Sequence, residues 1–139
     1  MNNTTIDQIQ RIEIPKISDP DGRGNLSVIE GEILPFTIKR VYYLYDVPSN
    51  STRGGHAHID LMQCLIALSG SFDVVLDDGE NKKVVTLNRP DVGLIIPTGI
   101  WRELENSSSG GVCLSLVSDV YKESDYIREY TGFISFKNT

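Results

Sequence analysis

The sequence has few of the residues that mark several common classes of protein. Its 139 residues include two cysteines, one tryptophan and two histidines. No apolar run is long enough to span a membrane. Residues 1–14 lack the basic segment followed by an apolar segment that a secretion signal needs. We therefore expect a cytoplasmic protein without a membrane partner.

Cysteine and positive charge are both scarce. No Cys-x-x-Cys pair occurs, and Cys64 and Cys113 each lie in an apolar run, which predicts two buried free thiols and no disulfide. The chain has 13 basic against 19 acidic residues and a formal net charge of −6. Without a basic block, this charge argues against a nucleic-acid partner. An anionic ligand would have to be attracted by a few well-placed arginines.

Short apolar or alternating runs, separated by turns rich in Gly, Asn, Asp, Pro and Ser, dominate the chain. A helix of normal length is hard to place, and residues 121–130 are the best candidate for a short helical turn. Asp78 and Gly79 are expected at a hairpin tip. The runs predict strands at 11–17, 25–30, 37–47, 61–70, 71–78, 82–87, 92–97 and 111–118. Without repeats or linkers, this pattern predicts one all-β domain, a sandwich or barrel.

Both histidines lie in the stretch RGGHAHIDLMQ. In a strand, His56 and His58 point to the same side, because side chains alternate between the two faces. Such a pair can bind a metal ion, transfer protons or have a purely structural role. The spacing from the histidines through Gln63 to Gly70 is similar to the first sequence motif of the cupins.

A second pattern resembles the other cupin motif. It consists of Gly93, Pro97, Gly99, Arg102 and Asn106. The two patterns, in this order, indicate a cupin fold, a small jelly-roll β-barrel. Trp101 then points away from the motif side, and we expect it in the core or in an interface.

The motif positions of metal ligands are changed in this chain. Metal-binding cupins bring three histidines and a carboxylate to one ion. Here Gln63, a neutral amide, takes the place of the carboxylate, and Arg102 takes the place of the third histidine. A guanidinium has no lone pair to give and repels a cation. We therefore expect no metal and favour proton transfer by the histidines, which titrate near neutral pH.

Other residues can complete a site around the histidines. Alternation along IKRVYY puts Arg40 and Tyr42 on one side, although patterning alone is equally consistent with Arg40 on a solvated face. Arg23 and Arg53 lie in turns and are by themselves only loop charges. Imidazoles and a phenol suit proton transfer next to a carbonyl, and arginines suit phosphate oxygens. This combination indicates an isomerase or epimerase for a phosphorylated or nucleotide-linked sugar.

In longer segments the chain resembles the dTDP-4-keto-6-deoxyglucose 3,4-ketoisomerases. The matching segments are DGRGNLSVIE, LPFTIKRVYYLYDV, RGGHAHIDLMQ, LSGSFDVVLDDG, PTGIWREL and LVSDVYKESDYIREYTGF. The resemblance implies a metal-free cupin barrel that forms a homodimer, with the N-terminal strand region (1–20) exchanged between subunits. It also implies that the keto group of a dTDP-linked 4-keto-6-deoxyhexose moves from C-4 to C-3. The product would serve the synthesis of dTDP-3-amino-3,6-dideoxyhexoses for polysaccharides such as O-antigen, or for natural products.

The resemblance also implies roles for individual residues. It makes His56 the general base, and it places His58, Tyr42 and Arg40 in the lining of the site. We hypothesise that His56 removes the C-3 proton to give an enediolate, and that Tyr42 and His58 relay protons between O-3 and O-4. No cofactor is expected, because there is no net redox change. The residues expected to bind the substrate are Arg40, Arg102, Arg23, Arg53 and Gln63.

Three other interpretations stay open. A dTDP-sugar 3,5-epimerase would have the same fold, but these enzymes are longer and use a histidine–aspartate dyad, and Asp60 alternates with neither histidine in an obvious way. The others are a metal-dependent cupin and a sugar-binding module without activity. The family divides by the product's configuration at C-4. Arg23 and Arg102 occupy positions that vary within it, so the sequence leaves this configuration open.

Overall fold

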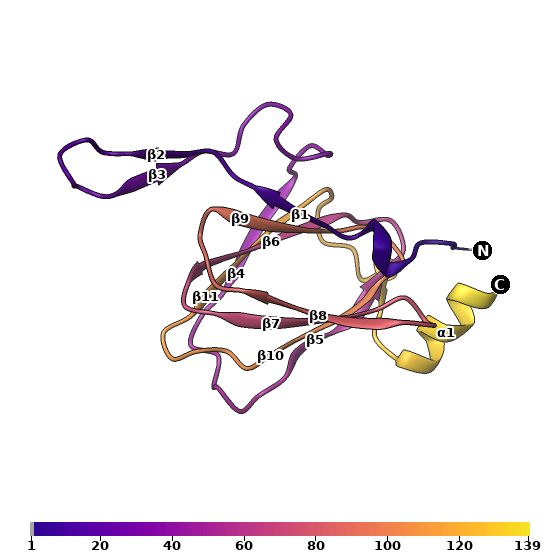
Figure 1. Cartoon of the computed structure of the whole chain (residues 1–139). Coiled ribbons are helices and arrows are strands. Elements are labelled where there is room, and N and C mark those ends of the chain that lie inside the picture. Colours follow the sequence, from indigo (N-terminus) through magenta and orange to yellow (C-terminus); the bar gives the residue numbers. More distant parts are fainter. Residues whose placement is uncertain (1) are drawn as a thin grey trace.

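Two five-stranded antiparallel sheets face each other in the computed structural model, which describes residues 2–139 (Figure 1). The first sheet has the order β1 (Gln10–Glu13), β9 (Val92–Ile96), β6 (Gln63–Ser69), β11 (Val112–Val117), β4 (Arg40–Leu44). The second has the order β12 (Tyr126–Ile127), β5 (Arg53–His58), β10 (Trp101–Glu105), β7 (Phe72–Asp77), β8 (Lys82–Leu87). The prediction of a single all-β domain with a cupin jelly roll is confirmed.

The space between the sheets holds the main core. Residues of β6, β7 and β9 that point inward, among them Leu65, Leu76 and Leu94, are almost completely buried there. Strand β6 is buried on both faces, because Cys64 and Ile66 pack under the segment that carries Leu34. Its side chains that point inward are therefore held rigidly, and Gln63 is one of them.

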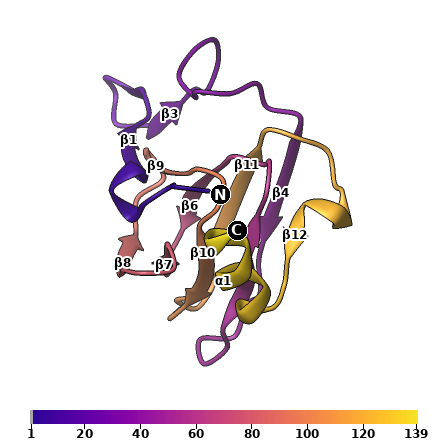
Figure 2. The same ribbon diagram turned by 90° about the vertical axis from the view of Figure 1, so that its right-hand side faces the viewer.

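A hairpin and an α-helix lie outside the two sheets. The hairpin of β2 (Lys16–Ser18) and β3 (Asn25–Ser27) projects away from the barrel (Figure 1). The helix α1 (Tyr130–Asn138) covers the second sheet, where Phe133 packs with Ala57 and Trp101. Figure 2 shows both chain ends on the same side of the barrel as α1. Among residues 2–139, no helix has the length and apolar character needed to cross a membrane.

Most of the expected elements are present. Each of the predicted runs overlaps a strand, although the run 11–17 is divided between β1 and β2, which belong to different sheets. Cys64 and Cys113 are buried and free, and the β7–β8 hairpin turns at Asp78 and Gly79, where Gly79 has a φ of 98°. Trp101 lies in the core, as expected. β1 pairs with β9 of the same chain, and an exchange of residues 1–20 between subunits stays a prediction.

The C-terminal segment differs in detail from the expectation. The stretch 121–130 contains only a 3₁₀ turn, η2 (Glu123–Asp125), followed by β12, and the α-helix begins at the end of this stretch, at Tyr130. Residues 126 and 127 are extended because they pair with His58 and Ala57 of β5. Tyr126 and Ile127 are residue types that are enriched in strands, which agrees with this pairing. A second 3₁₀ turn, η1 (Ile6–Gln8), precedes β1.

Candidate active site

A cavity of about 400 Å³ opens at one end of the barrel, between β4, β6 and β11 of the first sheet and β5 and β10 of the second. It is lined by polar and apolar side chains, and four of its residues are arginines. The residues proposed for catalysis that line it are Tyr42 and His56. The lining arginines are Arg40, Arg53, Arg102 and Arg128.

The two histidines project from β5 to the same side, as alternation requires. The Nε2 atoms of His56 and His58 are 3.0 Å apart, and the two rings are nearly perpendicular. His58 is fully buried, and its Nδ1 lies 2.7 Å from Oδ2 of Asp125. A carboxylate accepts hydrogen bonds, so Nδ1 of His58 carries the proton. In a neutral His58, Nε2 then accepts a hydrogen bond from Nε2–H of His56.

The surroundings keep both imidazoles neutral. Burial, followed by the positive charge of Arg102, lowers the pKa of His56 to about 2. Burial and the charges of Arg102 and Arg40 also lower the pKa of His58. Arg102 acts at close range because it is the cross-strand neighbour of His56 in the pairing of β10 with β5. The unliganded site therefore contains two neutral imidazoles beside fixed positive charge.

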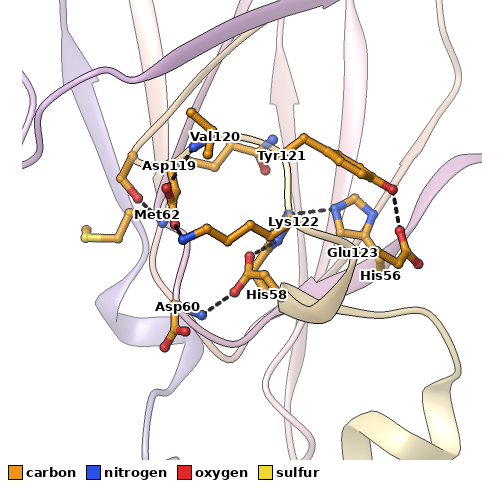
Figure 3. Close-up of polar contacts among 12 residues, drawn as sticks. His56, His58, Asp60, Met62, Asp119, Val120, Tyr121, Lys122 and Glu123 are labelled. Carbon is orange, nitrogen blue, oxygen red and sulfur yellow. Dashed lines mark hydrogen bonds and ion pairs between the residues drawn. The ribbon is translucent and has the colours of Figure 1, made fainter.

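The carboxylate of Asp125 is held in place by the backbone. Its Oδ1 accepts a hydrogen bond of 2.6 Å from the backbone N–H of Asp60, and its own carbonyl accepts one from Ile59. Figure 3 shows the histidine pair together with Asp60 and residues 119–123. A histidine–aspartate dyad therefore exists, but its acid is Asp125 in η2 and not Asp60, the aspartate closest in sequence to the histidines.

The segment after η2 covers the histidines. The ring of Tyr126 lies 5.1 Å from that of His56 and 4.5 Å from that of His58, measured between centroids. The guanidinium of Arg128 lies over the ring of Tyr126, 4.2 Å from the ring centroid. Glu123 accepts two hydrogen bonds from Arg128, of 2.7 and 2.8 Å. This ion pair orients a cation at the rim of the cavity.

A hydrogen-bonded chain crosses the cavity floor from β10 to β4. Arg102 donates to the carbonyl of Ile100 through Nε and Nη2, and to Oε1 of Gln63 through Nη1 at 2.7 Å. Nε2 of Gln63 donates to the hydroxyl of Tyr42 at 2.8 Å and to that of Ser115 at 2.7 Å. The phenol is thereby connected to a fully buried guanidinium.

The other predicted arginines lie in different places. Arg40 lines the cavity, and its guanidinium lies 5.3 Å from the ring centroid of Tyr42 and 5.5 Å from that of Tyr121. Its Nε and Nη2 are buried without a hydrogen-bond partner within residues 2–139. Arg53 is exposed at the cavity mouth. Arg23 lies outside the cavity, in the β2–β3 turn, where it binds Asp19.

Comparison with known proteins adds to this geometry. The family model described as "FdtA: WxcM-like, C-terminal" matches residues 7–138. The chain belongs to this family. The TDP-4-oxo-6-deoxy-alpha-D-glucose-3,4-oxoisomerase of Aneurinibacillus thermoaerophilus is 46% identical over 114 residues, which make up 81% of this chain and 82% of that protein. The chain is thus an isomerase of the sugar-nucleotide 3,4-ketoisomerase family.

Two solved structures share the fold of this ketoisomerase. A 3,4-ketoisomerase from Helicobacter canadensis has a TM-score of 0.91 and 42% identity, covering 95% of this chain and 98% of its own. A histidine-to-asparagine variant of the 3,4-ketoisomerase QdtA from Thermoanaerobacterium thermosaccharolyticum was solved in complex with TDP-4-keto-6-deoxyglucose. It has a TM-score of 0.91 and 39% identity, covering 96% of each chain.

Sequence reasoning missed two polar residues of this ketoisomerase site, Asp125 and Arg128. Both lie in the matching segment LVSDVYKESDYIREYTGF, so the resemblance itself was the signal that could have found them, although neither is close in sequence to a cupin motif residue. Only the pairing of β12 with β5 brings them to the histidines.

The donor set of the ketoisomerase site is poor in metal ligands. Within residues 2–139, no three His, Cys, Asp or Glu side chains lie where they could hold a metal ion together. The two changed motif positions also offer no free lone pair to a metal. Oε1 of Gln63 accepts a hydrogen bond from Arg102, and the guanidinium of Arg102 has no lone pair to donate.

Proposed function

We propose that this ketoisomerase acts on TDP-4-keto-6-deoxyglucose and moves its keto group from C-4 to C-3 without a metal or other cofactor. The observation that carries the proposal is that His56 lines a cavity together with Tyr42, and that behind it the buried His58 links His56 to Asp125 by hydrogen bonds. The QdtA complex with the same sugar nucleotide, and the activity named for the Aneurinibacillus relative, support this choice of substrate.

The first step is removal of the C-3 proton, which is acidified by the neighbouring C-4 carbonyl. His56 is neutral in the free enzyme and can accept this proton. The anionic diphosphate of the substrate offsets the charge of Arg128, which is one of the causes of the low pKa of His56, and it therefore raises this pKa toward the range useful for a general base.

The positive charge that forms on His56 does not stay on one ring. The proton between the two Nε2 atoms can move from His56 to His58, whose Nδ1–H faces the carboxylate of Asp125. The charge is then shared between two imidazoles and offset by the aspartate. Return of a proton to C-4, with loss of the O-3 proton, completes the isomerisation.

The diphosphate is assigned to the arginines at the cavity mouth. Arg40 has buried donors that need an acceptor, and leaving them unpaired is costly. Arg128 is oriented by Glu123, and Arg53 lies at the entrance. Guanidinium groups match phosphate oxygens with two parallel hydrogen bonds, so these three can hold the charged part of the substrate while the sugar reaches the histidines.

One measurement tests the reaction directly. Proton NMR follows the purified protein with TDP-4-keto-6-deoxyglucose in D₂O with a chelator. We expect a 3-keto sugar with deuterium at C-4, and the coupling constants will give the C-4 configuration. A persisting 4-keto group with deuterium at C-3 and C-5 would favour a 3,5-epimerase instead. The 3,5-epimerase is the second candidate function, because those enzymes use a histidine–aspartate dyad and His58 forms one with Asp125.

We also propose a homodimer. Val41, Tyr43 and Tyr45 are more than half exposed on or next to β4, a strand with a free edge. Ile17 and Leu26 are also more than half exposed, on the projecting hairpin.

An exchange of the N-terminal region would bring the hairpin, with Arg23, to a second copy. Light scattering is expected to give twice the mass of one chain, and Tyr43→Glu to give the monomer. A monomeric wild type would contradict the proposal.

A cytoplasmic location and a role in the synthesis of 3-amino-3,6-dideoxyhexoses stay predictions.

A further inference from the structure

The side chain of Gln63 is the link between Arg102 and Tyr42. It projects inward from β6, is 2% exposed, and contacts three polar side chains from β4, β10 and β11. The position corresponds to the carboxylate of the first cupin motif, so an amide here changes the chemistry of the site. The sequence predicts that Gln63 binds the substrate, whereas its hydrogen-bond partners indicate a different role.

The orientation of the amide follows from its partners. Arg102 can only donate, so the atom of Gln63 that it contacts at 2.7 Å is the oxygen Oε1. The nitrogen Nε2 then faces the hydroxyls of Tyr42 and Ser115, at 2.8 and 2.7 Å. Both N–H groups of Gln63 are used in these two bonds, so neither is available to a substrate.

The phenol of Tyr42 is therefore a hydrogen-bond acceptor toward Gln63. Its own O–H proton cannot point at Gln63, because an N–H already occupies that direction. Within residues 2–139 no other group takes this proton, and the side chain lines the cavity. The O–H is left to point into the cavity, where a substrate oxygen would lie.

We propose that Gln63 is a positioning residue, which keeps Tyr42 as a proton donor toward the sugar. This inference rests on the proposed ketoisomerase reaction. Tyr42 gives its proton to O-4 while His56 takes the proton of C-3, and a neutral enediol forms. The tyrosinate then takes the proton of O-3 while His56 returns one to C-4, so the charges and protons of the enzyme are restored.

Arg102 is the anchor of this arrangement. Its Nε and Nη2 both donate to the carbonyl of Ile100, which fixes the guanidinium against its own strand. The remaining donor holds Gln63 in the orientation that the phenol requires. Arg102 thus influences the reaction through Gln63 and Tyr42, in addition to its charge beside His56.

The decisive variant is Gln63→Glu, which has nearly the same shape but no N–H. Its carboxylate still accepts from Arg102, and it turns the Tyr42 proton away from the cavity by accepting it. We expect kcat to fall about 100-fold, the lower end of what one proton-transfer group contributes, with little change in TDP binding. In a Tyr42→Phe background, Gln63→Glu should cause no further loss of kcat. If Gln63→Glu lowered kcat by the same factor in the Tyr42→Phe background as in wild type, the inference would be overturned.

A second readout needs no substrate. In protein labelled with ¹³C at tyrosine Cζ, the signal that disappears in Tyr42→Phe identifies Tyr42. We expect this signal to move in Gln63→Glu and to stay in place in Ser115→Ala, which removes the other acceptor of the same amide. An unmoved signal in Gln63→Glu would overturn the inference.

The two readouts also separate this inference from the proposed function. If wild type left the TDP sugar unchanged while the Cζ signal moved, the proposed substrate would be wrong and the hydrogen-bond direction would stand. All assays contain a chelator, because Gln63→Glu places a carboxylate beside two histidines and so creates a possible metal site.

Discussion

Only one of the two Nε2 atoms that His56 and His58 place 3.0 Å apart carries a proton when both rings are neutral. Asp125 determines which one, because it holds the proton of His58 on Nδ1. The pair is therefore a directed chain from the half-buried His56 through the buried His58 to a carboxylate. That carboxylate, Asp125, is 67 residues after His58 in the sequence.

Replacement of His56 tests the general base. In His56→Asn, we expect kcat to fall by at least 100-fold, because an amide cannot accept the C-3 proton. TDP affinity, measured by calorimetry, should change little, since the charged part of the ligand is assigned to arginines. Unchanged turnover in this variant would contradict the mechanism.

Replacement of Asp125 tests the direction of the chain. The amide of Asp125→Asn can donate to Nδ1 of His58, which forces the proton to Nε2 and reverses the hydrogen bond with His56. We expect kcat to fall by about 100-fold or more. Asp60→Asn is the matched control, because Asp60 contributes only its backbone N–H and its side chain is exposed. Equal losses in the two variants would argue against a role for the dyad.

The pH dependence of stability follows from the lowered pKa of His56. Above about pH 6.5 the ring is neutral in the folded and the unfolded chain, so it contributes no slope. Below pH 6.5 only the unfolded chain binds the proton. The free energy of unfolding therefore decreases as the pH is lowered, by about 1.4 kcal/mol per pH unit for one such group. Urea unfolding between pH 5 and 8 should show a smaller slope for His56→Asn than for wild type. Identical slopes would contradict the lowered pKa.

Arg128 is expected to bind the diphosphate. Arg128→Ala should weaken TDP binding about 10-fold, in line with a hydrogen-bonded charge pair, and should reduce the salt dependence of binding. Arg89→Ala is the control, since Arg89 is an exposed arginine paired with Asp91 and does not line the cavity. Equal effects of the two replacements would show that only net charge matters.

Local patterns accounted for most of the fold. Alternating and apolar runs predicted the strands, because the period of side chains in a strand is two and each run must bury at least one face. The expected helical turn at 121–130 was found only as η2, and the α-helix lies at Tyr130–Asn138. The pairing of residues 126 and 127 with β5 is a long-range contact, and no local pattern reports it.

The sequence by itself determined the strand pattern, the common face of His56 and His58, the loss of the metal-ligand types at Gln63 and Arg102, and the buried state of both cysteines. These follow from residue type and spacing, which act over a few residues. Only the tertiary structure decided that Asp125 pairs with His58, that Arg128 reaches the cavity, and that Gln63 forms hydrogen bonds with Tyr42 and Arg102. These contacts join strands far apart in the chain, and their geometry depends on how the two sheets pack.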